Sequence, residues 1–309
     1  MKRTFILLAL SVCLICQASA QEKSNREEDG LRGLVKSVRI ECSVFEKRLA
    51  KWIEGRREIQ TVEKYDLGGN LIESAHYNQG VLERKFVSTF DGRGHLIETR
   101  TDESQAEFST QSLPRYNDQG RLVEEFLYDS KGSLLVRSGY SYDDRNNQTA
   151  AIHYDGKGAL NCRIDFTYDL EDRLVGVLCY VAEGGRASRE FNEYDSIGRK
   201  VLEAHYGQNN SLASKRVYHY DTSGNQAGSA LYDADGSLIA KTISVFDNRG
   251  HEIETATYED DHLKWREVRR FEFDSMGNWI KETATKFTAK TNGAYSKHIQ
   301  VKYRTITYY

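Results

Sequence analysis

Hydrophobic and polar residues alternate in short runs along most of this chain, and such alternation predicts β-strands. Residues 200–206 (KVLEAHY) are typical, because Leu202, Ala204 and Tyr206 would share one face of a strand and the residues between them the other. Runs of about 8–10 residues, each long enough for a strand of about 30 Å, recur between turn sequences. We therefore expect an all-β chain of about 17 or more strands, with no helix of consequence.

The turn sequences follow a repeated motif, in which an aromatic residue precedes Asp or Asn, and Gly or a substitute comes three or four residues later. First-type copies recur at a nearly constant interval, and second-type copies start at a fixed offset after a first-type copy. The first-type copies start at Tyr65, Phe90, Tyr116, Tyr142, Tyr168, Tyr194, Tyr220, Phe246 and Phe273. The second-type copies start at Tyr77, Tyr128, Tyr154, Tyr180, Tyr206, Tyr232 and Tyr258.

Each motif has the residues of a type I turn closed by a bulge. The Asp or Asn side chain accepts a hydrogen bond from the backbone two residues on, and Gly supplies a positive φ. Where Gly is missing, the chain has Asn146, Asp172, Asn210 or His262, residue types that tolerate left-handed backbone. The predicted structural turn glycines are Gly69, Gly94, Gly120, Gly198, Gly224, Gly250 and Gly277.

Connections this short make neighbouring strands antiparallel, so the predicted fold is a long meander with one turn per strand. First-type turns would lie along one rim and second-type turns along the other. A sheet of this many strands does not stay flat, because its twist accumulates. We expect one curled sheet built from double repeats of about 26 residues, in the form of a β-spiral, a trough or a partly closed barrel.

The N-terminal residues predict export. Lys2 and Arg3 precede a short apolar run at residues 5–16, and residues 18–20 (ASA) form a small-x-small cleavage site. The apolar run is too short to span a bilayer, and neither Cys13 nor Cys16 follows the small residue that a lipobox requires. Residues 1–20 are therefore a predicted signal peptide, and the mature chain is expected in the periplasm or outside the cell.

The rest of the chain divides into segments that differ in how regularly the turn motif recurs. Residues 21–30 (QEKSNREEDG) are polar and lack periodicity, which predicts a flexible leader. Residues 31–309 form a single predicted array. Within it, an irregular hairpin at 31–64 caps the N-terminal end, residues 65–282 hold the repeats, and strands within 283–309 cap the C-terminal end.

Composition narrows the class of protein. Of all residues, 39% are hydrophobic, 29% are charged and 11% are aromatic, which is too polar for a membrane-spanning protein and too aromatic for a disordered one. The 19 Tyr, against two Met and one Pro, favour half-buried β-surface over a thick apolar core. Removing Lys2 and Arg3 from the 43 basic residues leaves five fewer than the 46 acidic ones, without a basic patch. Nucleic acid is therefore not an expected partner.

Three cysteines remain in the mature chain, which enters an oxidising compartment. If Tyr168 pairs with Arg173 across its turn, Cys162 and Cys179 lie directly opposite each other on adjacent strands. We therefore predict a disulfide between Cys162 and Cys179, with Cys42 left over.

The Tyr-Asp-x-x-Gly-Asn/Arg-x-aliphatic pattern at Tyr65, Tyr194, Tyr220 and Phe273 resembles the Rhs/YD-repeat family of bacterial surface and secreted proteins. The segments 34–38 (LVKSV), 277–279 (GNW) and 306–309 (ITYY) resemble small exported members rather than the large toxins. The resemblance implies a β-array over residues 31–309. Long arrays in the family form a shell around a toxin, and other YD repeats are implicated in carbohydrate binding and adhesion. This chain departs from the family in having no Asp-Pro and in alternating a shorter with a longer spacing between successive turns.

No set of residues marks a catalytic or metal site. His76, His153 and His205 each precede a second-type Tyr and would be too far apart to converge, so we interpret them as solvated strand positions. The acidic segments 233–236 (DADG) and 259–262 (EDDH) lack the spacing of a calcium loop. A glycosidase needs two special carboxylates, whereas the carboxylates here recur as a set: Glu73, Glu124 and Glu203. We expect no enzyme activity, metal or cofactor.

The rows of tyrosines are the strongest functional feature. Turns of one type recur on every second strand, roughly 9–10 Å apart, so each rim presents a row of rings that can stack on sugars while polar neighbours bind hydroxyls. The alternative is that each ring only packs over its own hairpin. The candidate binding residues are Tyr128, Tyr154, Tyr180, Tyr206, Tyr232 and Tyr258.

The leading functional hypothesis is a non-catalytic exported scaffold that binds carbohydrate or a protein partner at the cell envelope or outside the cell. A second hypothesis is a shell or immunity-type partner of a separately encoded effector. A third, an enzyme with a cryptic carboxylate site, ranks last.

Overall fold

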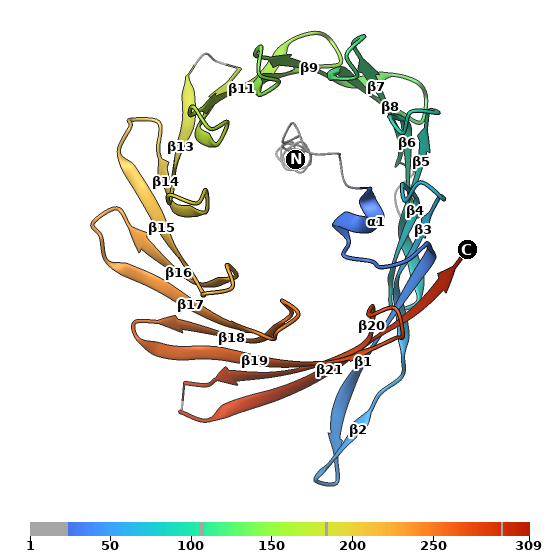
Figure 1. The fold of residues 1–309 in the computed structure, drawn as a ribbon, viewed down its shortest axis with the longest axis vertical. Coiled ribbons are helices and arrows are strands. Elements are labelled where there is room, and N and C mark those ends of the chain that lie inside the picture. The colour runs from blue at the N-terminus through green and yellow to red at the C-terminus, as the bar shows by residue number, and fades with distance from the viewer. Residues whose placement is uncertain (1–23, 105–107, 183–184, 292) are drawn as a thin grey trace.

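A computed structural model describes residues 24–104, 108–182, 185–291 and 293–309, so the predicted signal peptide lies outside the described residues. These residues form α1 (Asn25–Glu28) and 21 strands (Figure 1). The strands are β1 (Val35–Arg48), β2 (Lys51–Glu54), β3 (Glu58–Tyr65), β4 (Leu71–Asn78), β5 (Val81–Phe90), β6 (Leu96–Glu103), β7 (Phe108–Tyr116), β8 (Leu122–Asp129), β9 (Leu134–Tyr142), β10 (Gln148–Asp155), β11 (Leu160–Tyr168), β12 (Leu174–Val181), β13 (Arg186–Tyr194), β14 (Lys200–Tyr206), β15 (Leu212–Tyr220), β16 (Gln226–Asp233), β17 (Leu238–Phe246), β18 (Glu252–Glu259), β19 (His262–Phe273), β20 (Trp279–Ala289) and β21 (Tyr295–Tyr308).

The strands form one closed antiparallel ring. From β3 to β21 each strand pairs with the next along the chain, and β1 pairs with β3 on one side and with β21 on the other (Figure 1). The short strand β2 pairs with β1 and extends it as a hairpin that projects from the ring. The all-β meander predicted from the sequence is confirmed. The sheet curls until β1 pairs with β21, and this closure leaves the ring strands without open edges.

The repeated motif forms the predicted turn. In the copy at Tyr194, the Asp195 carboxylate accepts hydrogen bonds from the backbone N–H of Ile197 at 3.1 Å and of Arg199 at 2.8 Å. These bonds hold the pKa of Asp195 below its usual value, and the bond from Arg199 has the largest effect. All seven predicted turn glycines have φ between 79° and 90°.

The predicted substitutes for glycine are left-handed in three of four cases. Asn146, Asp172 and Asn210 have φ of 74°, 60° and 63°. The prediction for His262 was wrong, because its hairpin has a two-residue turn at Asp260 and Asp261, which take the positive φ values instead.

The turn bulges also shift the strand register, and this corrects the cysteine pairing. Tyr168 pairs with Leu174 rather than Arg173, and a further shift lies between Thr167 and Tyr168. Cys162 consequently lies opposite Val181 instead of Cys179. The predicted directly opposed pair is therefore wrong, and no disulfide joins these two described residues. The pairing of Cys162 with Cys179 was counted across a turn without a bulge, and so it left out the extra residue that the bulge inserts.

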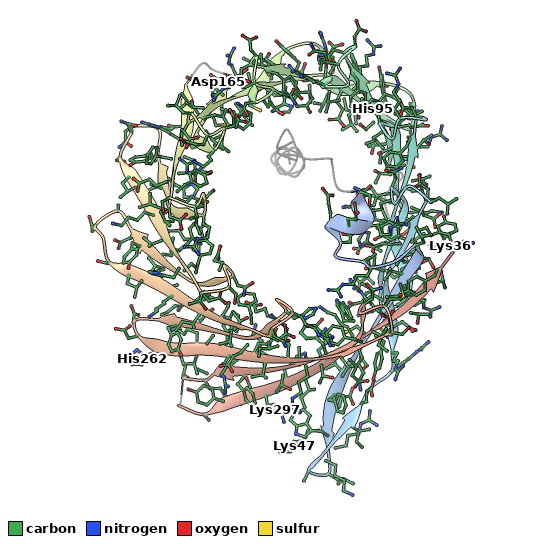
Figure 2. All side chains as sticks on the ribbon, viewed as in Figure 1. Lys36, Lys47, His95, Asp165, His262 and Lys297 are labelled. Atoms are coloured by element: carbon green, nitrogen blue, oxygen red, sulfur yellow. The ribbon has the colours of Figure 1, made fainter. Side chains whose placement is uncertain are left out.

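Alternation along the strands gives the ring an inner and an outer face, and side chains cover both (Figure 2). Residues 24–34, which include the helix α1, lie inside the ring (Figure 1). A buried apolar cluster lies there too, where Leu31 packs with Val35, Val38 and Tyr65. Face assignments elsewhere follow from strand pairing, because directly paired residues lie on the same face.

Residues 24–30, predicted to be a flexible leader, are instead held against the ring. The backbone N–H of Arg26 donates to the carbonyl of Gly69, and the N–H of Leu71 donates to the side chain of Asn25. Farther on, Arg32 exchanges two hydrogen bonds with the Asn278 side chain, at 2.7 and 2.9 Å. We call residues 24–34 the inner segment. It joins the first and the last of the first-type turns across the place where the ring closes.

No described helix is long and apolar enough to cross a membrane.

Candidate functional site

The six tyrosines predicted to bind lie on the outer face of the ring. They occupy alternate strands, from Tyr128 on β8 to Tyr258 on β18. Their side follows from pairing. Successive direct pairs carry the inner face from Val38 through β3–β7 to Asp129 on β8, and alternation along β8 then places Glu125 and its partner Ser138 on the same face. His153 pairs with Ser138, and the neighbouring Tyr154 therefore points outward. The same alternation places each later member of the set outward.

Five of the six tyrosines lie directly opposite a basic residue on the preceding strand. Lys215 Nζ lies 5.4 Å from the centre of the Tyr232 ring, and the Arg189 guanidinium lies 5.9 Å from that of Tyr206. We call this set the tyrosine–cation row. Its pairs are Arg137 and Tyr154, Arg163 and Tyr180, Arg189 and Tyr206, Lys215 and Tyr232, and Lys241 and Tyr258.

Apolar residues complete the surface of the row. On its other side each cation faces an aromatic or aliphatic residue of the strand before, such as Leu178 opposite Arg189 and Ala230 opposite Lys241. Arg189 and Lys241 are themselves exposed. Each repeat thus places one aromatic ring beside one basic head group, with an apolar residue on the other side of the cation.

The hydroxyl groups distinguish this row from the first-type tyrosines. Tyr194 and Tyr220 donate their hydroxyl hydrogens to the carbonyls of Leu174 and Lys200, at 2.8 and 2.6 Å, which fixes the ring over the sheet. Tyr142 and Tyr168 make equivalent bonds. Among the described residues, no hydroxyl of the six outer tyrosines makes a hydrogen bond within the chain. These four first-type hydroxyls therefore bind within the sheet, whereas the outer hydroxyls make no bond to the described chain.

Sequence reasoning missed the basic half of the row. The signal was present, because Arg137, Arg163, Arg189, Lys215 and Lys241 recur once in each double repeat, in step with the turns. A search for a basic patch in contiguous sequence overlooks residues that only the sheet brings side by side.

A second polar cluster lies on the inner face beside the closure of the ring. The Tyr65 hydroxyl lies 2.7 Å from Asp29 and 3.1 Å from Glu63, and it has one hydrogen to share between the two carboxylates. Burial, and then the charge of Asp29, raise the pKa of Glu63. The Arg304 guanidinium lies over the Trp279 ring at 3.8 Å, and burial lowers the pKa of Arg304. The cluster binds Asp29 of the inner segment, which indicates a structural role.

The histidines do not converge. His153 bonds to Ser138 at 2.8 Å and His205 to Glu203 at 2.9 Å, each at a separate place on the inner face. His153 is not the solvated residue that the sequence suggested, because burial lowers its pKa. In the described part of the chain, no group of three or more His, Cys, Asp or Glu is placed to hold a metal ion.

The recurring carboxylates are neutralised by neighbours. Glu73 lies 3.0 Å from Lys64 and 3.2 Å from Lys85 across the strands. Although burial opposes it, these contacts lower the pKa of Glu73. Glu124 bonds to Arg137 at 2.5 Å, and Glu203 bonds to Lys200 and His205. A general acid needs a raised pKa, whereas the pKa of Glu73 and that of Glu203 are lowered.

Comparison with known proteins finds only distant matches among solved structures. No family model and no curated protein matches the chain. A porin-like protein from Bacteroides uniformis is 11% identical over 88% of this chain and 98% of its own, with a TM-score of 0.38. The Photorhabdus luminescens Tc holotoxin pore is 13% identical with a TM-score of 0.29, and the TcdB2-TccC3-Cdc42 complex is 12% identical with a TM-score of 0.26. In both, the match covers 78% of this chain and 17% of the other.

Proposed function

We propose that this chain is a non-catalytic, exported repeat protein of the YD-repeat type that binds a carbohydrate polymer on the outside of its ring. The observation that carries the proposal is the row of outward tyrosine rings on alternate strands, whose hydroxyl groups have no hydrogen-bond partner within the described chain. Aromatic rings stack on the apolar faces of sugars, and a hydroxyl at the ring edge binds sugar hydroxyls. The protein would act at the cell envelope or in the extracellular space.

The repeat suits a polymer better than a single sugar. Equivalent rings recur every second strand, roughly 9–10 Å apart, which is close to the length of two linked pyranose rings. Each ring alone would bind weakly, but several rings engaged at once raise the affinity through their effective concentration. This is why the function belongs to the row and not to one tyrosine.

The charged residues of the outer face also favour a ring whose outer surface is in contact with water. Ion pairs occur at mid-strand positions around it, including Arg163 with Asp165 within β11 at 2.7 Å and Arg266 on β19 with Glu254 on β18 at 2.6 Å. A lipid-facing sheet would need an apolar band at this level. Together with the predicted signal peptide, these pairs favour release into an aqueous compartment.

A glycan array probed with the mature chain tests the proposal. We expect binding to one or more polysaccharides, and loss of that binding when Tyr206 and Tyr232 are both changed to Ala. The matched control is Tyr295→Ala, because Tyr295 is an exposed tyrosine at the start of β21, away from the row. Thermal unfolding of each variant shows that the ring is intact. Equal binding by the double variant and the control, or no glycan binding at all, would refute the proposal.

A second candidate function rests on the inner segment. The ring already holds a stretch of its own chain through backbone and side-chain hydrogen bonds on the inner face. This favours the shell or immunity-type hypothesis, in which the ring encloses a segment of a separately encoded effector. Co-expression with the product of a neighbouring gene tests it. A stable one-to-one complex in the absence of glycan binding would favour this candidate, and the absence of a complex would remove it.

A further inference from the structure

We infer that the tyrosine–cation row takes an acidic polysaccharide, with a carboxylate on about every second sugar, rather than a neutral one. This inference rests on the proposed function. It names the chemistry of the ligand, because the row offers basic groups at the same spacing as the rings. Equivalent cations lie two strands, or roughly 9–10 Å, apart.

Three cations of the row have no acidic partner. Arg137 bonds to Glu124 and Arg163 to Asp165, so their charges are partly satisfied within the chain. Among the described residues, Arg189, Lys215 and Lys241 make no ion pair. The part of the row on β13–β18 therefore carries an uncompensated positive charge, although the whole chain has a net charge of −3.

The surroundings of these three cations strengthen an interaction with a carboxylate. Lys215 lies between Ala204 on one neighbouring strand and Tyr232 on the other, and Lys241 lies between Ala230 and Tyr258. Apolar neighbours remove water from one side of the head group, and a cation beside a ring keeps N–H donors free for an anion. A sugar stacked on the ring would bring its carboxylate to the adjacent ammonium or guanidinium group.

The spacing of charge disfavours nucleic acid as the occupant. Each strand of duplex DNA carries one phosphate per about 3.4 Å of helix axis, so about three phosphates would face each cation of the row. An alternating polysaccharide with one acidic group per disaccharide matches one cation per repeat. The sparse charge therefore favours the polysaccharide.

The test compares two polymers that differ only in charge. Hyaluronan has one carboxylate per disaccharide, and its carboxyl-reduced form keeps the same backbone without the charge. We expect the mature protein to bind hyaluronan about tenfold or more tightly than the reduced form at about 50 mM salt, and that difference to shrink at about 300 mM. This comparison needs no variant and so does not depend on how a variant folds.

Variants then locate the effect. We expect the triple change Arg189→Ala, Lys215→Ala and Lys241→Ala to lower hyaluronan affinity about tenfold, a larger loss than for the carboxyl-reduced form. Arg270→Ala is the matched control, because Arg270 is an exposed outer-face arginine on β19, away from the row, and this variant should bind as the wild type does.

The outcomes separate the two proposals. Equal affinity for both polymers, reduced in both cases by Tyr206→Ala with Tyr232→Ala, would overturn the acidic ligand and leave the carbohydrate function standing. Binding of oligo-deoxythymidine as tight as that of hyaluronan would overturn the polysaccharide assignment. Absence of binding to either polymer and to every glycan of the array would overturn both.

Discussion

Lys215 on β15 lies directly opposite Tyr232 on β16, with its ammonium 5.4 Å from the centre of the ring. Tyr220, the tyrosine of the preceding turn motif, has a structural role instead. It donates its hydroxyl hydrogen to the Lys200 carbonyl on the neighbouring strand β14. One repeated motif thus produces two rows of rings. The inner row fixes the sheet, and the outer row stands beside cations, three of which make no ion pair among the described residues.

The two rows should respond differently to loss of the hydroxyl. Tyr220→Phe leaves the Lys200 carbonyl without its donor, and we expect a loss of about 1 kcal/mol in the free energy of unfolding. Tyr232→Phe removes a hydroxyl that makes no bond within the described chain, so its effect should be close to zero. Urea unfolding monitored by circular dichroism measures both. Equal losses would show that the outer hydroxyl also has a structural partner.

The closure of the ring should depend on Asn278. This side chain is 2% exposed and bonds to the backbone of Arg32 and to the Tyr308 hydroxyl. We expect Asn278→Ala to cost about 2–3 kcal/mol, because it leaves buried groups of the inner segment without partners. Limited proteolysis should also cleave residues 24–34 sooner.

The matched control for Asn278 is Asn225→Ala. Asn225 holds the same place in an interior turn, but among the described residues its side chain bonds only to Asp221 of its own turn. We expect a smaller loss of stability and no change in the cleavage of residues 24–34. If the two variants behave alike, the contact between Asn278 and the inner segment does not stabilise the closure.

Glu63 should make stability depend on pH. Its pKa in the folded chain is raised by burial and by the charge of Asp29, so the folded state holds the Glu63 proton more tightly than the unfolded state does. The stability that the folded state gains from this tighter proton binding is fully present below the ordinary glutamate pKa of 4.5. It is lost as the pH rises through the pKa of Glu63 in the folded chain. The groups facing Glu63 are Asp29, Tyr65, His76 and Arg304.

Glu63→Gln removes this dependence. Its melting temperature should rise relative to that of the wild type between about pH 4 and pH 8, because only the wild type acquires a buried charge over that range. Differential scanning calorimetry at several pH values measures the difference. A difference that stays constant with pH would show that Glu63 titrates alike in the folded and unfolded chains.

The turn glycine Gly198 should be needed for its backbone conformation alone. Its φ is 86°, and a Cβ there would meet no atom within 4 Å. We expect Gly198→Ala to cost about 1–2 kcal/mol, since the left-handed region is strained for alanine. Gly139→Ala is the control, because Gly139 also has open space but no positive φ, and it should change stability little. Chemical unfolding of both variants provides the measurement.

The sequence predicted what is local and missed what is distant. Asp195 and Gly198 form their turn with nearby residues only, so the turns and the strands between them were predictable. Nothing local in Val38 indicates that it pairs with Ile306, and this pairing closes the ring. The basic half of the candidate site was missed for the same reason. Arg189 and Lys215 are a whole double repeat apart in the sequence, and only the sheet places them in one row.

The register at Cys162 provides the last prediction. Cys162 lies diagonally from Cys179, a separation of about 7–8 Å between Cα atoms that exceeds the usual range for a disulfide. Burial also raises the pKa of Cys179 and so lowers the fraction of reactive thiolate. We therefore expect peptide mapping without reduction to find both as thiols. Combining Val181→Cys with Cys179→Val should instead give a cross-link to Cys162 under mild oxidation, because residues 162 and 181 are direct partners. A cross-link in the wild type and none in this variant would mean that the strands pair in the register without the bulge.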